Sequence, residues 1–342
     1  MEQKKKNTNI QPYVAVAPMM DWTDRHCRYF HRLLSPNIRL FTEMITTGAL
    51  IHGDRDRFLR FDPSEHPVVL QLGGDDPTAL AQCAKMAEDY GYDEVNLNCG
   101  CPSDRVQSGN FGACLMSQPE LVADCVAKMI NATTIPVTVK CRIAIDNEEE
   151  LPFLTKYLEE VSNAGCKEFT IHARKAWLKG LSPKENREIP PLRYDIVQEA
   201  KTLFPDLRII LNGGIKSCED VQSAIEDFDG VMIGRQAYHD PYFLAEIERD
   251  IFGNATPLSR AEVAERMVPY IQNQTEKYGT PPKTITRHML GLYKGQTGSN
   301  AWKRYISENA HLKDTKASIL LDALAQIPNP DLINSGVTKE HA

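Results

Sequence analysis

The segment from Asn96 to Cys114 carries the residue types in this chain that are best suited to chemistry. Cys101 opens a loop with glycines between Gly100 and Gly112, so its thiol is free to move over a bound substrate. An unperturbed thiol has a pKa of about 8.5 and is mostly protonated at neutral pH, so it can act as a general acid. A nucleophilic role needs a base or strong positive charge, and only Arg105 offers charge locally. Cys99 and Cys101 stand in C-x-C spacing, but no C-x-x-C or histidine pair completes a four-ligand set, so no metal site is expected.

Lys140 closes a short apolar run and has two well-founded chemical uses. It can form a Schiff base with a carbonyl substrate, or place positive charge against the pyrimidine edge of a flavin. Gln71 and His172 end similar runs, and their amide and imidazole groups match the acceptors and donors of an isoalloxazine edge, which favours the flavin. A structural lysine extending to the rim is the alternative without chemistry. Arg142 and Arg174, two residues past Lys140 and His172, are expected to line the rim where a large anionic substrate enters.

A phosphate site is predicted from two glycine-containing turns. One is Asn212, Gly213 and Gly214, and the other is Gly234 and Arg235. Glycine lets backbone amides approach an anion, and an arginine adds charge and a fork of donors. A sugar phosphate, a nucleotide and a flavin mononucleotide all fit such a site. Both G-x-G-x-x-G and the P-loop pattern are absent, so neither a dinucleotide-binding half-domain nor a P-loop is indicated. A pair of tight turns with a surface arginine is the alternative.

Eight runs rich in Val, Ile and Leu must position these residues, and they read as strands buried on both faces. Most are separated by stretches of helical period, such as 78–90, 119–131, 148–163, 194–203 and 218–227, which predicts a parallel (β/α)₈ barrel, or TIM barrel. In such barrels the active site lies at the carboxyl ends of the strands. The eight runs are Tyr13–Pro18, Leu40–Ile45, Pro67–Leu72, Glu94–Asn98, Pro136–Lys140, Glu168–His172, Arg208–Asn212 and Gly230–Gly234. The residues at or next to their ends are Met19, Glu43, Gln71, Asn98, Lys140, His172, Asn212 and Arg235.

The chain has 342 residues, more than the roughly 250 of one barrel, so a small extra domain is expected after the eighth strand. We expect a flexible N-terminus over 1–11, the barrel over 12–252, a helical bundle over 255–327 and a tail over 328–342. No apolar run approaches the roughly 20 residues of a membrane span, and no signal peptide is evident, so a cytoplasmic protein is expected. The nine cysteines are interpreted as free thiols.

The net charge of −7 argues against a general nucleic-acid binder, but the charge is unevenly distributed. Residues 255–342 hold 11 Lys and Arg against 8 Asp and Glu, which leaves a net of −10 on the rest. The stretch from Lys277 to Arg304 contains six basic residues and no acidic one. It is interpreted as a phosphate-facing surface, the alternative being a solvated helix face of incidental sign.

Several motifs together resemble the tRNA-dihydrouridine synthases. They are Val16–Asp21, Thr42–Ile45, Gln71–Gly74, Asn98–Ser103, Val139–Arg142, Ile171–Arg174, Asn212–Ile215 and Ile233–Arg235. The segment His172–Arg187, with Pro190–Leu192 after it, is similar to the bacterial A-type branch. The resemblance covers about residues 12 to 240 densely and continues more loosely to about 325.

This resemblance implies an FMN-containing barrel and a helical bundle that reduce uridines 20 and 20a in the tRNA D-loop with NADPH. Hydride passes from NADPH to the flavin and then to uracil C6, while Cys101 protonates C5. Asn98 contacts the uracil, which is flipped out of the tRNA at a cost of a few kcal/mol. The implied flavin contacts are the Pro18, Met19 and Met20 backbone, Gln71, Lys140 and His172, with Asn212, Gly213, Gly214, Gly234 and Arg235 at the phosphate.

The resemblance also carries over tRNA contacts. Lys184 and Arg187 match positions in the barrel, and Asn300, Lys303 and Arg304 match less fixed positions in the bundle. Phosphate contacts along Lys277 to Arg304 are expected to position the tRNA without reading its sequence. One departure is Cys99, where related sequences often have a plain apolar residue. A monomer is expected.

Three alternatives compete with this interpretation. An FMN barrel acting on a small pyrimidine such as orotate shares the flavin residues, but it leaves the basic bundle without a purpose. A Schiff-base aldolase uses Lys140. A non-catalytic RNA-binding module retains the barrel without its flavin.

Overall fold

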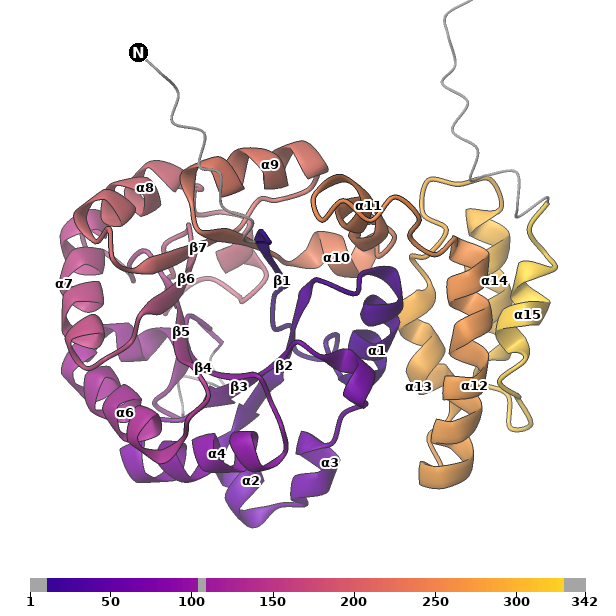
Figure 1. Cartoon of the computed structure of the whole chain (residues 1–342), viewed down its shortest axis with the longest axis horizontal. Coiled ribbons are helices and arrows are strands. Elements are labelled where there is room, and N and C mark those ends of the chain that lie inside the picture. The colour runs from indigo at the N-terminus through magenta and orange to yellow at the C-terminus, as the bar shows by residue number, and fades with distance from the viewer. Residues whose placement is uncertain (1–10, 104–108, 329–342) are drawn as a thin grey trace, which may run out of the picture.

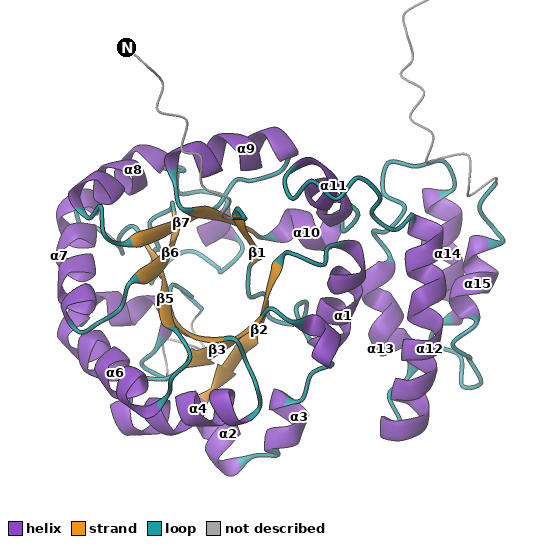
Figure 2. Cartoon of the chain, viewed as in Figure 1, coloured by secondary structure: helices purple, strands orange, loops and turns teal. Residues whose placement is uncertain are grey.

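Eight parallel strands form a closed barrel in sequence order, each hydrogen-bonded to the next and β8 to β1. The computed structural model describes residues 11–103 and 109–328. Figure 2 shows the strands at the centre of the molecule and the helices around them. The strands are β1 Tyr13–Val16, β2 Arg39–Thr46, β3 Val68–Gly73, β4 Glu94–Cys99, β5 Val137–Arg142, β6 Glu168–His172, β7 Arg208–Asn212 and β8 Gly230–Ile233.

Helices cover the outside of the barrel, and each predicted apolar run is a strand, so the predicted TIM barrel is confirmed. The barrel helices are α1 Arg25–Leu34, α2 Thr47–His52, α3 Arg55–Leu59, α4 Pro77–Asp89, α6 Pro119–Ala132, α7 Glu150–Asn163, α8 Tyr194–Leu203, α9 Cys218–Asp227, α10 Arg235–His239 and α11 Phe243–Asp250. Short 3₁₀ turns are η1 Pro63–Glu65, η2 Gly112–Ser117, η3 Glu185–Arg187 and η4 Arg287–Met289.

Four further helices lie beside α1, outside the barrel (Figure 1). They are α12 Arg260–Tyr278, α13 Pro282–Thr286, α14 Ser299–Asn309 and α15 Ile319–Leu324. We call α12 to α15 the helical bundle. The expected domain limits at 252, 255 and 327 stay a prediction, and the expected terminal segments 1–11 and 328–342 lie almost wholly outside the described residues.

The long helix α12 contains a proline, a residue that usually ends or kinks a helix. Pro269 lies inside the helix. The true ends are a capping box between Ser259 and Glu262 and a left-handed Gly279 with φ 66°. These two caps outweigh one proline, because Val263, Met267 and other residues along the buried face anchor the helix on both sides of it.

Two further observations concern the cysteines and the length of the helices. All nine cysteines lie within the described residues as free thiols. No helix in the described part of the chain is long and apolar enough to cross a membrane.

A charged cluster closes the barrel at the amino ends of the strands, formed by Tyr13, Arg39, Glu94, Glu168 and Arg208. Arg39 Nη1 lies 2.8 Å from Glu94 Oε2, and Arg208 Nη1 lies 3.0 Å from Glu168 Oε2. The guanidinium carbons of both arginines lie over the Tyr13 ring, at 5.1 and 4.5 Å. Burial, reinforced by Glu168, raises the pKa of Glu94 to about 7. These charged groups therefore stabilise the closed end of the barrel, whereas the active-site mouth lies at the opposite end.

Glu94 should make the stability of this protein depend on pH. A carboxyl whose pKa is raised in the folded state favours folding below its unfolded pKa of about 4.5, and this contribution is lost as the pH rises through about 7. We expect the free energy of unfolding to fall by about 3 kcal/mol across that window. Urea unfolding at several pH values should show a flatter dependence for Glu94→Gln, whereas the exposed control Glu199→Gln should match the wild type. Equal slopes for wild type and Glu94→Gln would contradict the assignment.

Candidate active site

A chain of hydrogen bonds runs through the barrel interior from the charged cluster toward the mouth. Thr138 Oγ1 donates to Glu94 Oε1 at 2.6 Å, and Asn96 Nδ2 donates to Thr138 Oγ1 at 2.8 Å. Nearer the mouth, Gln71 Nε2 donates to Asn96 Oδ1, and Asn98 Nδ2 donates to Gln71 Oε1, both at 2.9 Å. All five side chains are buried. The chain therefore fixes which amide atoms Gln71 and Asn98 present to their surroundings.

The loop after β4 is anchored to the end of this chain. Asn98 Oδ1 accepts a hydrogen bond from the backbone N–H of Cys101 at 3.1 Å. Cys101 is half-buried, and its thiol lies close enough to Lys140 and Arg142 to act on the pKa of both. Arg105, the other cation expected near this thiol, lies outside the described residues. A thiol in such surroundings can donate a proton, because the neighbouring cations stabilise the thiolate that remains.

Lys140 and Asn212 form a second polar pair at the mouth. Lys140 Nζ donates to Asn212 Oδ1 at 2.9 Å, while Asn212 Nδ2 donates to the Met232 carbonyl at 2.8 Å. Burial, with a smaller effect of Arg142, lowers the pKa of Lys140 to about 8. Burial and the same cations hold the pKa of His172 well below its usual range, so the imidazole is neutral. One cation and one neutral ring thus face the same space.

The two predicted glycine turns have the backbone that an anion cradle needs. Gly213 and Gly214 have φ of 113° and 81°, which side chains rarely adopt. A Cβ on Gly213 would lie 2.8 Å from His172 Cδ2, and one on Gly214 would lie 2.4 Å from Tyr194 Oη. At Gly234, by contrast, a Cβ would meet nothing within 4 Å, so the backbone there borders open space. Both turns therefore have features that suit close approach of an anion to the backbone, and the phosphate site stays a prediction.

The loop between β6 and α8 adds cations to the same rim. Arg235 Nη1 lies 2.6 Å from Glu188 Oε1, so the arginine expected at a phosphate is ion-paired at a half-buried position. Arg174 donates to the carbonyls of Glu188 and Pro190. Arg187 is exposed, and burial of part of its guanidinium together with nearby Arg235 lowers its pKa. Repulsion of this kind among neighbouring cations favours an anionic ligand.

Arg142 is expected at the rim of the barrel mouth, but the structure places its side chain in the interior. Its side chain is only 3% exposed. Its Nε donates to the Gly100 carbonyl at 3.1 Å, and its Nη1 donates to the carbonyls of Asn186 and Lys175 at 3.0 and 3.3 Å. These carbonyls enclose the guanidinium and join the loop after β4 to the loop after β6. Its assignment to substrate binding stays a prediction.

The segment after β1 lies beside the strand ends that carry these groups. Met19 N donates to Thr23 Oγ1 at 2.9 Å, and its carbonyl accepts from the backbone of Trp22 and Thr23, so this backbone is tightly folded. Pro18 and Met19 are half-buried, whereas Met20 is 57% exposed. The expected flavin contacts from this backbone stay a prediction.

Comparisons with known proteins decide the family. The family described as Dihydrouridine synthase (Dus) matches residues 15–327. This chain belongs to the dihydrouridine synthase family. It is 56% identical to the tRNA-dihydrouridine(20/20a) synthase of Vibrio parahaemolyticus over 317 residues, covering 92% of this chain and 97% of that protein. Identity is also 56% to the protein of the same name from Escherichia coli strain K12, covering 91% and 90% of the two chains.

A solved structure supports the barrel alone. The complex of 2-naphthoyl-CoA reductase with 2-naphthoyl-CoA aligns with a TM-score of 0.55 at 10% identity, covering 70% of this chain and 50% of that one. Such low identity shows a shared fold and carries no argument about substrate. The dihydrouridine synthase family is a family of oxidoreductases, so this chain is an enzyme of that class.

The bundle residues that the sequence analysis carried over lie on one helix of this dihydrouridine synthase. Asn300, Lys303 and Arg304 are exposed on α14, whereas Trp302 and Ile306 are buried. Trp302 Nε1 donates to the Met289 carbonyl at 2.9 Å and so fixes the helix. The exposed face of α14 is therefore held in place while its polar side chains remain free to meet a ligand.

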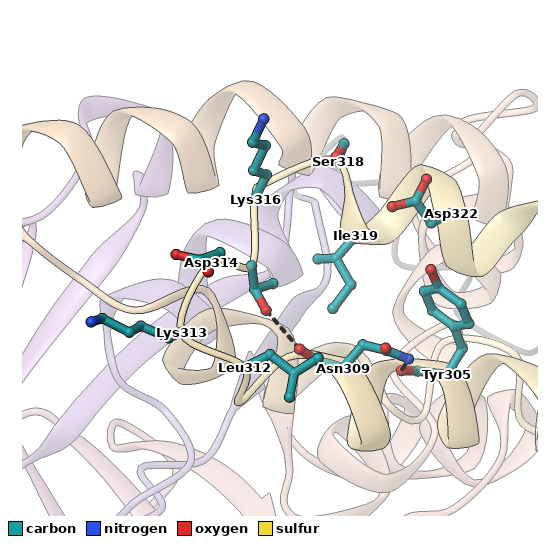
Figure 3. Close-up of a pocket in the computed structure, with 10 residues that line it drawn as sticks. Tyr305, Asn309, Leu312, Lys313, Asp314, Lys316, Ser318, Ile319 and Asp322 are labelled. Carbon is teal, nitrogen blue, oxygen red and sulfur yellow. Dashed lines mark hydrogen bonds between the residues drawn. The ribbon is translucent and has the colours of Figure 1, made fainter.

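A hollow of about 570 Å³ lies between α14 and α15 (Figure 3). Its wall mixes Lys313 and Lys316 with Asp314 and Asp322, and Thr315 Oγ1 donates to the Asn309 carbonyl at 2.6 Å across one side. The mixed signs indicate no preference for an anion. No cluster of three potential metal-ligating side chains occurs among residues 11–103 and 109–328.

The joint between the barrel and the bundle is not predicted from the sequence. Asp24 caps α1 and lies 2.9 Å from Arg287 Nη2 and 3.0 Å from His288 Nε2. Burial alone would raise the pKa of Asp24, but the hydrogen bond and charge of His288, the charge of His26 and the backbone N–H of Cys27 together hold it well below its usual range. Tyr29 of α1 stacks on Tyr270 of α12 with ring centroids 3.8 Å apart. The partners are over 200 positions apart, so only the cap at Asp24 gave a local signal.

Breaking the internal chain should destabilise the fold. Thr138→Val removes the hydroxyl that joins Asn96 to Glu94 without changing the shape, and leaves two buried polar groups without a partner. We expect the free energy of unfolding to fall by about 1–3 kcal/mol, measured by urea unfolding. The control Thr170→Val lies on the next strand, where the buried hydroxyl joins no such chain among the described residues. An equal loss in both variants would show that the chain contributes nothing particular.

Proposed function

We propose that this dihydrouridine synthase reduces the C5–C6 double bond of uridines 20 and 20a in the D-loop of tRNA, with FMN as cofactor and NADPH as reductant. The observation that carries the proposal is the 56% identity, across 97% of its length, to a protein named tRNA-dihydrouridine(20/20a) synthase. The site geometry supports it, because a half-buried thiol stands beside a cation and a set of fixed amides at one barrel mouth.

The residues at the mouth fit a flavin mononucleotide. Gln71 and Asn98 present fixed amides, Lys140 is a cation at neutral pH, and the cradle of Gly213 and Gly214 suits a phosphate. Lys140 and His172 would hold the pyrimidine edge, and Arg235 would join the phosphate after leaving Glu188. When bound, the flavin supplies hydride that originates from NADPH and passes to uracil C6.

The chain's own residues then have distinct tasks. Asn98 would bond the uracil, and its Oδ1 already holds the backbone of Cys101 in place. Cys101 would deliver its proton to uracil C5, and the cations Lys140 and Arg142 would stabilise the thiolate that remains. Asn98 and Cys101 would act on the same pyrimidine, so the fixed distance between them matters more than the hydrogen-bond strength of Asn98 or the acidity of Cys101.

Binding of tRNA is proposed to use the cationic rim and the bundle. The barrel contributes Arg174, Lys184 and Arg187, and α14 contributes the exposed Asn300, Lys303 and Arg304. Phosphate contacts at both places would offset the few kcal/mol needed to flip out a uridine. This assigns a purpose to a basic bundle on an acidic chain, which a small-pyrimidine reductase or an aldolase leaves unexplained. The expected cytoplasmic location and monomeric state stay predictions.

The direct test is a single-turnover experiment. The purified flavoprotein is reduced without oxygen and mixed with unmodified tRNA transcript, and the return of the oxidised-flavin absorbance band is followed. Rapid reoxidation by tRNA, but not by free uridine or orotate, is the expected result. Reoxidation only by a small pyrimidine, or a purified protein without flavin, would refute the proposal.

Cys101→Ala should separate the two half-reactions. We expect flavin reduction by NADPH to be unchanged and dihydrouridine formation in tRNA to fall by about 10²-fold or more, because the proton donor is lost. The control is Cys114→Ala, which removes another half-buried thiol near the same loop. Mass spectrometry of the digested tRNA measures the product. Normal dihydrouridine formation by Cys101→Ala would exclude the thiol as the acid.

A further inference from the structure

A hollow of about 280 Å³ lies beside the barrel mouth, on the side of β1 and β2. It is enclosed by the segment after β1, the end of β2, and helices α2 and α3. Its wall combines charged groups with apolar ones, and none of its residues except Met20 belongs to the proposed flavin or tRNA contacts. Five side chains give the wall its chemical character: Met20, Arg25, Glu43, Arg57 and Phe58.

The hollow shares a wall with the proposed flavin site. Thr42, which lines it, accepts a hydrogen bond from the Gln71 backbone N–H at 3.0 Å through its Oγ1. Met44, also in the wall, is the register partner of Gln71 across β2 and β3. Met20 directly follows Pro18 and Met19. A ligand in the hollow would therefore lie next to whatever occupies the mouth.

Arg25 supplies an unpaired cation at this wall. Its Nη2 donates to the Arg57 carbonyl, but its buried Nη1 has no hydrogen-bond partner. Among the described residues, no carboxylate lies within ion-pair distance of Arg25 or Arg57. Burial and the like charges of Arg60 and Arg28 lower the pKa of Arg25. A buried donor without a partner is costly, so a turn of the Arg25 guanidinium toward the hollow would let a phosphate oxygen there pair with it.

Glu43 is the strand-end residue for which the proposed reaction has no use. Its Oε1 accepts from the Asp21 backbone N–H at 2.5 Å, and the side chain is half-buried. A carboxylate has about four acceptor positions, so most of its capacity remains for N–H donors in the hollow. Phe58 and the exposed Met20 add apolar surface on which a base can stack.

We propose that this hollow binds the nucleotide adjacent to the target uridine, with Arg25 and Arg57 at its phosphate and Glu43 accepting hydrogen bonds from its base. Guanine is the base that fits, because its pairing edge offers two neighbouring N–H donors to one carboxylate. This inference rests on the proposed function, since it requires tRNA at the mouth.

Residues in and near the wall of the hollow contact the helical bundle. Asp24, in its wall, holds Arg287 at 2.9 Å. The guanidinium carbon of Arg60, just past α3, lies 3.5 Å from the centre of the Tyr278 ring of α12. Tyr278 follows Lys277, where the basic stretch begins. RNA leaving the hollow would thus meet the basic surface of the bundle at once.

The phosphate contact is tested with Arg57→Gln, since this side chain is exposed and its loss spares the fold. Reoxidation of the reduced flavin is measured against tRNA concentration at several salt concentrations. We expect the apparent Kd to rise about tenfold and the slope of log Kd against log salt to fall by about one. The control Lys156→Gln removes a charge from a side chain 71% exposed on α7, on the far side of the barrel in Figure 1, and should match the wild type.

The base contact is tested with tRNA transcripts that carry guanosine, inosine or an abasic site next to the target uridine, on either side. The wild type should bind the guanosine transcript about tenfold more tightly than the inosine one on one side, because inosine lacks the amino group. Glu43→Gln keeps an acceptor for Asp21 but should lose this discrimination. Flavin content and the rate of reduction by NADPH should not change in either variant.

Three results would overturn the inference. One is an Arg57→Gln enzyme with the wild-type Kd and salt slope, and another is indifference to abasic sites on both sides. The third is a variant that changes flavin content or reduction by NADPH instead, which would assign the hollow to the cofactor or the reductant. If reduced wild-type enzyme is not reoxidised by any tRNA, the proposed function itself has failed.

Discussion

The site depends on one buried acceptor, the carboxylate of Glu94, because it sets the direction of every hydrogen bond above it. Thr138 donates to Glu94, Asn96 to Thr138, Gln71 to Asn96, and Asn98 to Gln71. With its amide N–H committed downward, Asn98 has its oxygen left for the backbone of the Cys101 loop. An acceptor oxygen at the closed end of the barrel thus orients groups at the open end, through a chain that a reversed amide would break.

The two ends of the barrel treat charge in opposite ways. At the closed end, Arg39 and Arg208 lie against Glu94 and Glu168, so opposite signs nearly balance. At the mouth, Lys140 and its arginine neighbours have no buried carboxylate within ion-pair distance among the described residues, and burial together with the charge of Arg142 lowers the pKa of Lys140. Repulsion among such cations lowers the folding stability of the free enzyme, but the same cations stabilise a complex with an anion.

The strands and several site residues could be predicted from sequence because their signals are local. Apolar runs with a polar end locate β4, β5 and β6 within a residue or two, and glycine pairs locate the turn at Gly213. The buried state of Arg142 and the pairing of Arg235 with Glu188 could not, because the partners come from other loops. Asn96 and Thr138 left a usable signal, since a polar residue two positions before a strand end repeats the inward alternation.

The joint at Asp24 connects the two nucleic-acid surfaces that the proposed function requires. Arg287 and His288 reach this cap at the start of α1, and Tyr29 stacks on α12 within the same contact. The segment before α1 leads directly from the barrel mouth, so the bundle is tied to the mouth itself rather than to a remote face. Under the proposed function, this joint fixes the distance between α14 and the barrel mouth, so a tRNA bound at α14 would bring only the nucleotides at that distance to Cys101.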